Sequence, residues 1–161
     1  MPTQKLQPSR ALQVIKSDNA GIPSVNLIDF GTNTSVTALR LVASAATFVT
    51  DNVQAGDIVY NITDGTAATV VSVVSQTQII LNADIFLATA KSFQIYQQSS
   101  QTGLGNQGCV LYIGTGGNLR VLTSGNDVIT FNNVQDGMFF PINVIQVYAT
   151  GTTALNIIAL W

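Results

Sequence analysis

The side chains that usually perform acid–base or nucleophilic chemistry are scarce in this sequence. The chain of 161 residues has no histidine, and its eight acidic residues are all aspartates. It also has one cysteine, four tyrosines, and six lysines and arginines. General acid–base catalysis relies mainly on His, Glu or Asp, and an activated nucleophile needs a neighbouring base. The composition therefore predicts a protein that is not an enzyme and has no catalytic residues.

One glycine-rich motif is typical of dinucleotide binding. Residues 103–108 match the pattern G-x-G-x-x-G, and Asp127 follows about twenty residues later, as the full motif requires. The motif also needs a strand before the glycines and a helix after them, because the helix N-terminus holds the pyrophosphate. Here a Gln/Ser-rich segment precedes the glycines and a strand-like run begins at Cys109. We therefore expect no nucleotide and no other cofactor.

The aspartates suggest two further kinds of site. Asp51, Asp57, Asp64 and Asp84 could supply oxygen ligands to calcium, and two facing carboxylates could cleave a glycosidic bond. No EF-hand or nonapeptide spacing is present, however, and no carboxylate pair stands out. Each of the four lies beside Gly, Asn or a strand end, where aspartate commonly caps a turn. We expect turn-capping aspartates and no metal site. Cys109 lies in an apolar run without a histidine to activate it, which predicts a buried, inert thiol.

Charge and hydropathy also exclude several partners. The formal net charge is −2, so no long-range field attracts nucleic acid or anionic lipid. No apolar run reaches the roughly 20 residues that a membrane helix needs. The first ten residues lack the apolar segment of a signal peptide. We expect no nucleic acid, no membrane and folding in a cytoplasm.

Residue types and spacing predict an all-β protein. Val, Ile and Thr are abundant and fit a pleated sheet, whereas the helix former Glu is absent. Short strand-like runs alternate with Gly, Asn and Asp, which is typical of a β-sandwich or a jelly-roll-like barrel. The clearest hairpin signals lie at residues 63–66 and 114–117. Only residues 83–88 could form a helical turn.

The chain divides into segments of different character. Residues 1–24 are polar and predict an extended N-terminal arm, either frayed or ordered on a neighbouring subunit. Residues 97–103 read as a linker. We predict that residues 25–32 join residues 103–161 in one β-sandwich-like core domain. Residues 33–98 then form a second, small β domain inserted into it. Two consecutive domains are the alternative.

Large apolar side chains gather at the end of the chain, where termini usually fray. They belong either to a last strand buried in its own domain or to a surface that identical subunits cover, because obligate interfaces resemble a core cut in half. These candidates are Phe139, Phe140, Ile157, Ile158, Leu160 and Trp161.

Two groups of segments resemble proteins of tailed bacteriophages. Residues 53–73, with 84–86 and 93–96, are similar to a module that recurs in virion structural proteins. The second group resembles the C-terminal β domain of small phage particle proteins, including capsid cement and spike-base proteins. It comprises residues 109–117, 131–137, 141–144, 149–154 and 157–161.

The resemblance implies a non-enzymatic virion protein made in the host cytoplasm. As a cement or decoration protein it would form a homo-oligomer, a trimer, on the capsid exterior and bind the major capsid protein. Phe139, Phe140 and residues 157–161 would then lie near the subunit contact, and the arm with Lys5 and Arg10 would reach a neighbour. The alternative is a tail, spike-base or fibre-associated protein. A cell-derived carbohydrate-binding β module is a third class.

Overall fold

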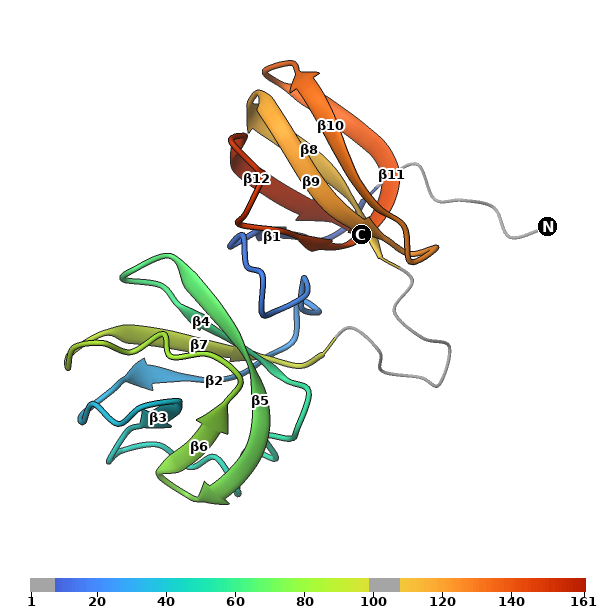
Figure 1. Cartoon of the computed structure of the whole chain (residues 1–161). Helices are drawn as coiled ribbons and strands as arrows, with labels where there is room; N and C mark the ends of the chain where they lie inside the picture. The colour runs from blue at the N-terminus through green and yellow to red at the C-terminus, as the bar shows by residue number, and fades with distance from the viewer. Residues whose placement is uncertain (1–7, 99–107) are drawn as a thin grey trace.

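The computed structural model describes residues 8–98 and 108–161, and these form an all-β molecule. Twelve strands make two six-stranded antiparallel sheets, which appear as two units in Figure 1. No helix occurs in the described ranges, so none there is long and apolar enough to cross a membrane. The all-β prediction is confirmed.

The first sheet, called here the curled sheet, contains the strands between residues 27 and 96. Its long strand β5 pairs with β4 through its first half and with β6 through its second half. A bridge between Ser35 and Val42 links the segment after β2 to β3, so the two ends of the sheet approach each other. Its strand order is β2 (Leu27–Thr32), β7 (Ser92–Tyr96), β4 (Ile58–Asn61), β5 (Thr66–Ser75), β6 (Gln78–Leu81) and β3 (Arg40–Val42).

Large apolar side chains fill the inside of the curled sheet. Phe48 and Phe93 pack with their ring centroids 6.0 Å apart. The hairpin predicted at residues 63–66 is confirmed as the turn between β4 and β5, with Gly65 at φ +66°. The predicted helical turn at 83–88 is wrong, because this segment is irregular and the buried Asn61 amide donates to the Ile85 carbonyl. Side-chain hydrogen bonding replaces the helical bonds there.

The second sheet, called here the C-terminal sheet, is built from a bent ribbon. Strand β11 pairs with β8 over its first part and with β9 over its last part, so it spans both. The strand order is β1 (Ala11–Gln13), β12 (Leu155–Leu160), β8 (Cys109–Thr115), β11 (Met138–Val147), β9 (Gly117–Thr123) and β10 (Val128–Val134).

The glycines between β8 and β9 form a corner rather than a hairpin. Strands β8 and β9 are not neighbours, since β11 lies between them, so the predicted hairpin at 114–117 is wrong. A Cβ on Gly116 would lie 2.1 Å from the Val134 carbonyl oxygen. The Gly116 N–H also donates to the Asp136 carboxylate. Glycine is needed here because another backbone comes close, not because a two-residue turn closes a hairpin.

The strand that completes the C-terminal sheet differs from the prediction. Strand β2 pairs with β7 in the curled sheet, from Leu27 opposite Tyr96 to Thr32 opposite Ser92. The assignment of residues 25–32 to the same domain as 103–161 is therefore wrong. Strand β1 takes that place by pairing with β12. The chain thus starts in the C-terminal sheet, forms the curled sheet and then returns.

Residues 14–22, called here the strap, connect the two sheets. On one side the N–H groups of Val14, Ser17 and Ile22 donate to carbonyls of the C-terminal sheet at 2.8–3.0 Å. On the other side, the buried Ser17 hydroxyl donates to the Ala67 carbonyl at 2.8 Å, and the Thr69 hydroxyl donates to the Asn19 carbonyl. The strap therefore has hydrogen bonds to both sheets.

The predicted arm is not extended over its described part. Residues 8–24 include β1 and the strap, and they use their backbone groups within their own chain. Val14, Ala20 and Ile22 of this part are buried in the cores of their own chain. Contact of this part with a neighbouring subunit stays a prediction. Residues 1–7, with Lys5, lie outside the described residues. So do most of the predicted linker and of the glycine motif at 103–108.

Candidate assembly surface

Strands β8 and β12 alternate between a buried side and an apolar outward side. Leu111 and Ile113 of β8 point into the core, whereas Val110 and Tyr112 point outward. Pairing places Tyr112 between Ile158 of β12 and Phe139 of β11. Register thus gathers separate segments into one surface, called here the outer face: Val110, Tyr112, Phe139, Pro141, Ile158, Leu160 and Trp161.

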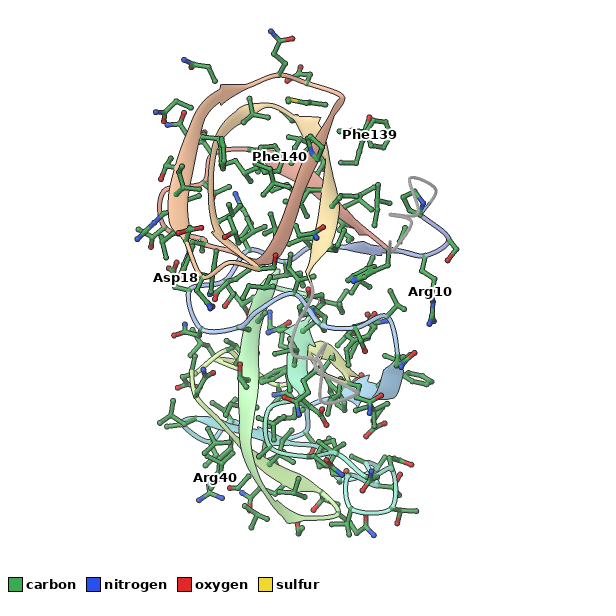
Figure 2. All side chains as sticks on the ribbon, turned by 90° about the vertical axis from the view of Figure 1, so that its right-hand side faces the viewer. Arg10, Asp18, Arg40, Phe139 and Phe140 are labelled. Atoms are coloured by element: carbon green, nitrogen blue, oxygen red, sulfur yellow. The ribbon has the colours of Figure 1, made fainter. Side chains whose placement is uncertain are left out.

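Phe139 is a large, exposed aromatic member of the outer face. Its side chain is 66% exposed and projects from the C-terminal sheet in Figure 2. One edge-to-face contact, with ring centroids 5.3 Å apart, joins it to Tyr112. Phe140, the next residue, points the opposite way and is 4% exposed. Its ring packs edge-to-face on Phe131, with the ring centroids 4.7 Å apart. The pleat therefore gives these two phenylalanines different roles: one is surface and one is core.

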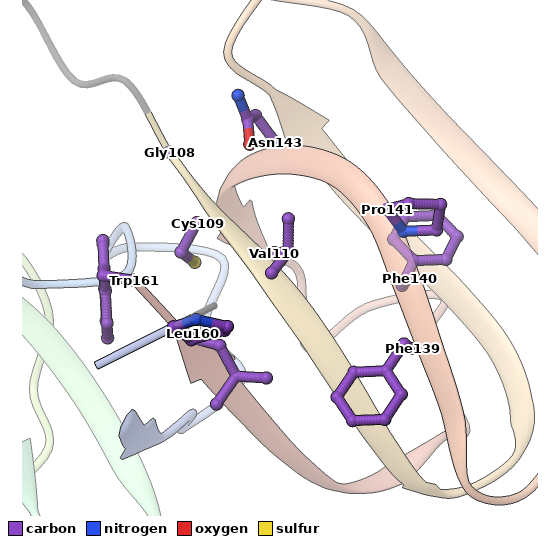
Figure 3. Close-up of a pocket in the computed structure, with 10 residues that line it drawn as sticks. Gly108, Cys109, Val110, Phe139, Phe140, Pro141, Asn143, Leu160 and Trp161 are labelled. Carbon is purple, nitrogen blue, oxygen red and sulfur yellow. The ribbon is translucent and has the colours of Figure 1, made fainter. Parts of the chain in front are cut away.

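A groove of about 520 Å³ lies beside Phe139 on this side of the sheet. Val110, Leu160 and Trp161 form its apolar wall, and Asn143 contributes an amide, as Figure 3 shows. Among the residues that the structure describes, no lysine, arginine or aspartate lines it. Its chemistry suits apolar contact with another molecule rather than attraction of an ion.

Charged side chains near the C-terminal sheet are held in internal hydrogen bonds. The Lys16 ammonium donates to the Thr152 and Ala154 carbonyls, both at 3.1 Å. Arg120 lies 4.8 Å from the centroid of the Tyr148 ring. Hydrogen bonds from Thr150 hold the pKa of the exposed Asp18 below its usual value, and Arg120 adds a smaller effect. None of these charges belongs to the outer face.

The structure brings together four of the residues predicted for an interface. Phe139, Ile158, Leu160 and Trp161 belong to the outer face. Sequence reasoning missed Val110 and Tyr112. Alternation along β8 could have identified both, since buried and outward residues strictly alternate from Cys109 to Ile113.

The other predicted interface residues lie elsewhere. Phe140 and Ile157 are core residues, the latter 2% exposed, so their selection as contact residues is wrong. Both side chains point inward because of strand register. The Arg10 guanidinium donates to Asn26 at 3.2 Å within its own chain. Lys5 lies outside the described ranges.

Asp57 and Asp64 of the curled sheet make hydrogen bonds that support turns, as expected for these two residues. Asp57 is buried, and its carboxylate accepts from the N–H groups of Gln54 and Gln98 at 2.7 and 3.1 Å. Desolvation raises the pKa of Asp57, and these hydrogen bonds partly offset the rise. Asp64 forms a 2.7 Å ion pair with Lys91. In the described part of the chain, no group of three or more acidic or cysteine residues could hold a metal ion.

Cys109 is buried beneath the groove. Its thiol donates to the Val144 carbonyl at 3.5 Å, and burial raises its pKa to about 12. A nucleophilic cysteine needs a lowered pKa and access to substrate. The predicted burial of this thiol is confirmed.

Comparison of the chain with models of known families, with characterised proteins and with solved structures gave no match. The outer face therefore has to be interpreted from its own geometry and from the sequence resemblance.

Proposed function

We propose that the protein is a non-enzymatic virion structural protein of a tailed bacteriophage. In the most specific form of this proposal it is a capsid cement or decoration protein, which self-associates as a trimer and binds the lattice of the major capsid protein. The observation that carries it is the outer face, an apolar surface with an exposed Phe139 and a groove whose described lining has no lysine, arginine or aspartate. The sequence resemblance to phage particle proteins gives this surface its context.

The chemistry of the outer face fits association between subunits. The core of an interface is depleted of charge and enriched in aromatic residues, and the outer face contains Tyr112, Phe139 and Trp161. Two such neutral faces meet without desolvating an ion, which avoids the main cost of burying charged groups. Closed rings of identical subunits are the usual form of such contacts.

The same features fit a role in stabilising a shell. A cement protein adds buried area across joints between capsomers, and many symmetric copies repeat each contact. Linked contacts multiply modest single affinities, so no individual contact has to be tight. Binding through an uncharged surface also depends little on salt, because screening weakens only Coulomb attraction.

A tail, spike-base or fibre-associated protein is the second candidate. The observation that favours it is the resemblance of residues 141–144, 149–154 and 157–161, which includes spike-base proteins as well as cement proteins. Such a protein would use the same outer face on another virion component.

Quantitative mass spectrometry of purified particles tests the proposal and separates the two candidates. A cement protein is expected in a copy number that is a simple lattice fraction of the major capsid protein. Only a few copies per particle would favour the tail or spike-base alternative. If the chain is no more abundant in purified particles than contaminating host proteins, both candidate functions are contradicted.

A further inference from the structure

We propose that β10 is an open sheet edge that pairs with β10 of a second copy of this chain, antiparallel and around a two-fold axis. Strand β10 ends the C-terminal sheet, and no strand in the described part of the chain pairs with its far side. An unpaired edge presents backbone N–H and C=O groups that a further strand can bind. The contact shares no residue with the outer face and does not depend on a role in virions.

Strand register shows which backbone groups of β10 face the open edge. Thr130 lies opposite Arg120 of β9. The Arg120 N–H donates to the Thr152 hydroxyl, and the Arg120 carbonyl accepts from the Tyr148 N–H, so both groups point away from β10. In an antiparallel ladder the two residues of such a pair exchange no hydrogen bonds. The N–H and C=O of Thr130, and those of Val128 two residues earlier, therefore point away from β9 toward the open edge.

The first part of β10 lacks the charge and the proline that usually protect an edge. Residues 128–131 contain neither, and Val128 and Ile129 are 51% and 44% exposed. Edge strand β2 of the curled sheet gives the contrast, because its Asp29 carboxylate accepts from the Phe30 N–H at 2.6 Å. A charge within a strand discourages further pairing, so β10 is the more available edge.

Two antiparallel registers join the outward groups of two copies. With Thr130 opposite Thr130, Ile129 packs beside Phe131 of the second copy, and such apolar cross-strand pairs stabilise a sheet. With Val128 opposite Thr130, Asp127 instead lies opposite Phe131, which desolvates a carboxylate without a partner. The first register avoids this cost, so it is the register of the proposed contact.

A groove of about 720 Å³ beside this edge offers room for side chains of the added strand. Val128, Ile129 and Phe131 line it from β10, and Ile142 and Asn143 line it from β11. Strand addition gains affinity from main-chain hydrogen bonds and specificity from pockets for alternate side chains. The register of β10 against β9 shifts after Phe131, so the regular edge is short. The contact is therefore small, and a covalent trap is the suitable test.

Thr130→Cys tests the register directly. Opposed residues of a hydrogen-bonded antiparallel pair have Cα atoms about 5.5 Å apart, which suits a disulfide. With glutathione disulfide as the oxidant, most of the purified variant should form dimers joined at position 130, as non-reducing electrophoresis and peptide mapping would show. Thr32→Cys is the matched control, at an exposed threonine of edge strand β2, and should stay monomeric on the same gel. Cys109 does not compete because it is buried.

Thr130→Pro tests the backbone pairing separately. It removes the outward N–H and keeps the hydrogen bonds to β9, and proline is tolerated at such positions of edge strands. Each copy then loses one interstrand hydrogen bond, so dimerisation should weaken about tenfold or more. Sedimentation equilibrium in the Phe139→Ser background, where the outer face is weakened, measures this change. Thermal unfolding checks that the variant is folded.

Two results would overturn the proposal. One is an equal dimer yield for Thr130→Cys and Thr32→Cys, and the other is equal dimerisation of a folded Thr130→Pro variant and its parent. If Thr130→Cys cross-links to the major capsid protein in purified particles and not to itself, the edge takes a strand of that protein and self-pairing is wrong. Particle copy number supports or contradicts the virion role independently of these results.

Discussion

Replacing Phe139 with serine should weaken self-association and leave the fold intact. The side chain is 66% exposed, and its one aromatic contact within the chain is with Tyr112. Loss of that pair costs about 0.5–1.5 kcal/mol of folding stability. The adjacent Phe140→Ala should cost about 3–5 kcal/mol, because it empties a core position.

The effect on association follows from the part of the Phe139 side chain that is exposed in the single chain and that a second subunit could bury. Burying a whole phenylalanine side chain contributes about 1.5–3 kcal/mol, so about two-thirds of that, 1–2 kcal/mol, is available to a subunit contact. A free-energy loss of this size weakens each contact about 5-fold to 30-fold. In a ring of identical subunits the loss recurs at every contact.

Sedimentation equilibrium over a range of protein concentrations measures this effect, and thermal unfolding monitors the fold. Phe30→Ser is the matched control, because Phe30 is 70% exposed but lies on β2 of the curled sheet. Phe139→Ser should shift the association constant while Phe30→Ser leaves it unchanged. Equal association constants for the two variants would refute the assignment of the outer face.

Three further predictions concern the fold. Gly116→Ala should prevent folding or destabilise the chain by more than about 3 kcal/mol, because its Cβ meets backbone at 2.1 Å. Gly65→Ala, at φ +66° with open space around it, should cost only about 1 kcal/mol; urea unfolding of both variants checks the contrast. The raised pKa of Asp57 means that the folded state holds its proton more tightly. The free energy of unfolding of the unmodified chain, relative to that of Asp57→Asn, should therefore fall as pH rises from about 4 through the folded pKa of Asp57. Urea titrations at several pH values would measure this difference. A difference that does not change with pH would contradict the prediction. Cys109 should resist iodoacetamide at pH 8 in the folded chain and react in urea, as mass spectrometry would show; rapid labelling of the folded chain would contradict its burial.

Local sequence signals predicted most of the strands but not all of their partners. The Asp64-Gly65 pair marked a hairpin because its chemistry is specific to that turn. Gly116 was misread because a glycine needed for close backbone approach resembles one needed for a turn. Strand β1 was missed because three residues are too few to show a period of two.

The outer face was only partly predictable for a similar reason. Adjacent residues of a strand point to opposite sides, so Phe139 and Phe140 could not both be surface residues. Which of them is exposed depends on the register of β11 against β8, including the irregularity between Phe140 and Val144. The neighbourhood of Tyr112, Phe139 and Ile158 likewise depends on pairing between distant segments.

Hydroxyl-radical footprinting of the free chain and of purified particles tests the central claim most directly. The proposal predicts that Tyr112, Phe139 and Trp161 of the outer face are strongly protected in the particle. Phe30, exposed on the curled sheet, serves as the internal reference for the change. Equal reactivity of the outer face in the free chain and in the particle would contradict the claim that other subunits cover it.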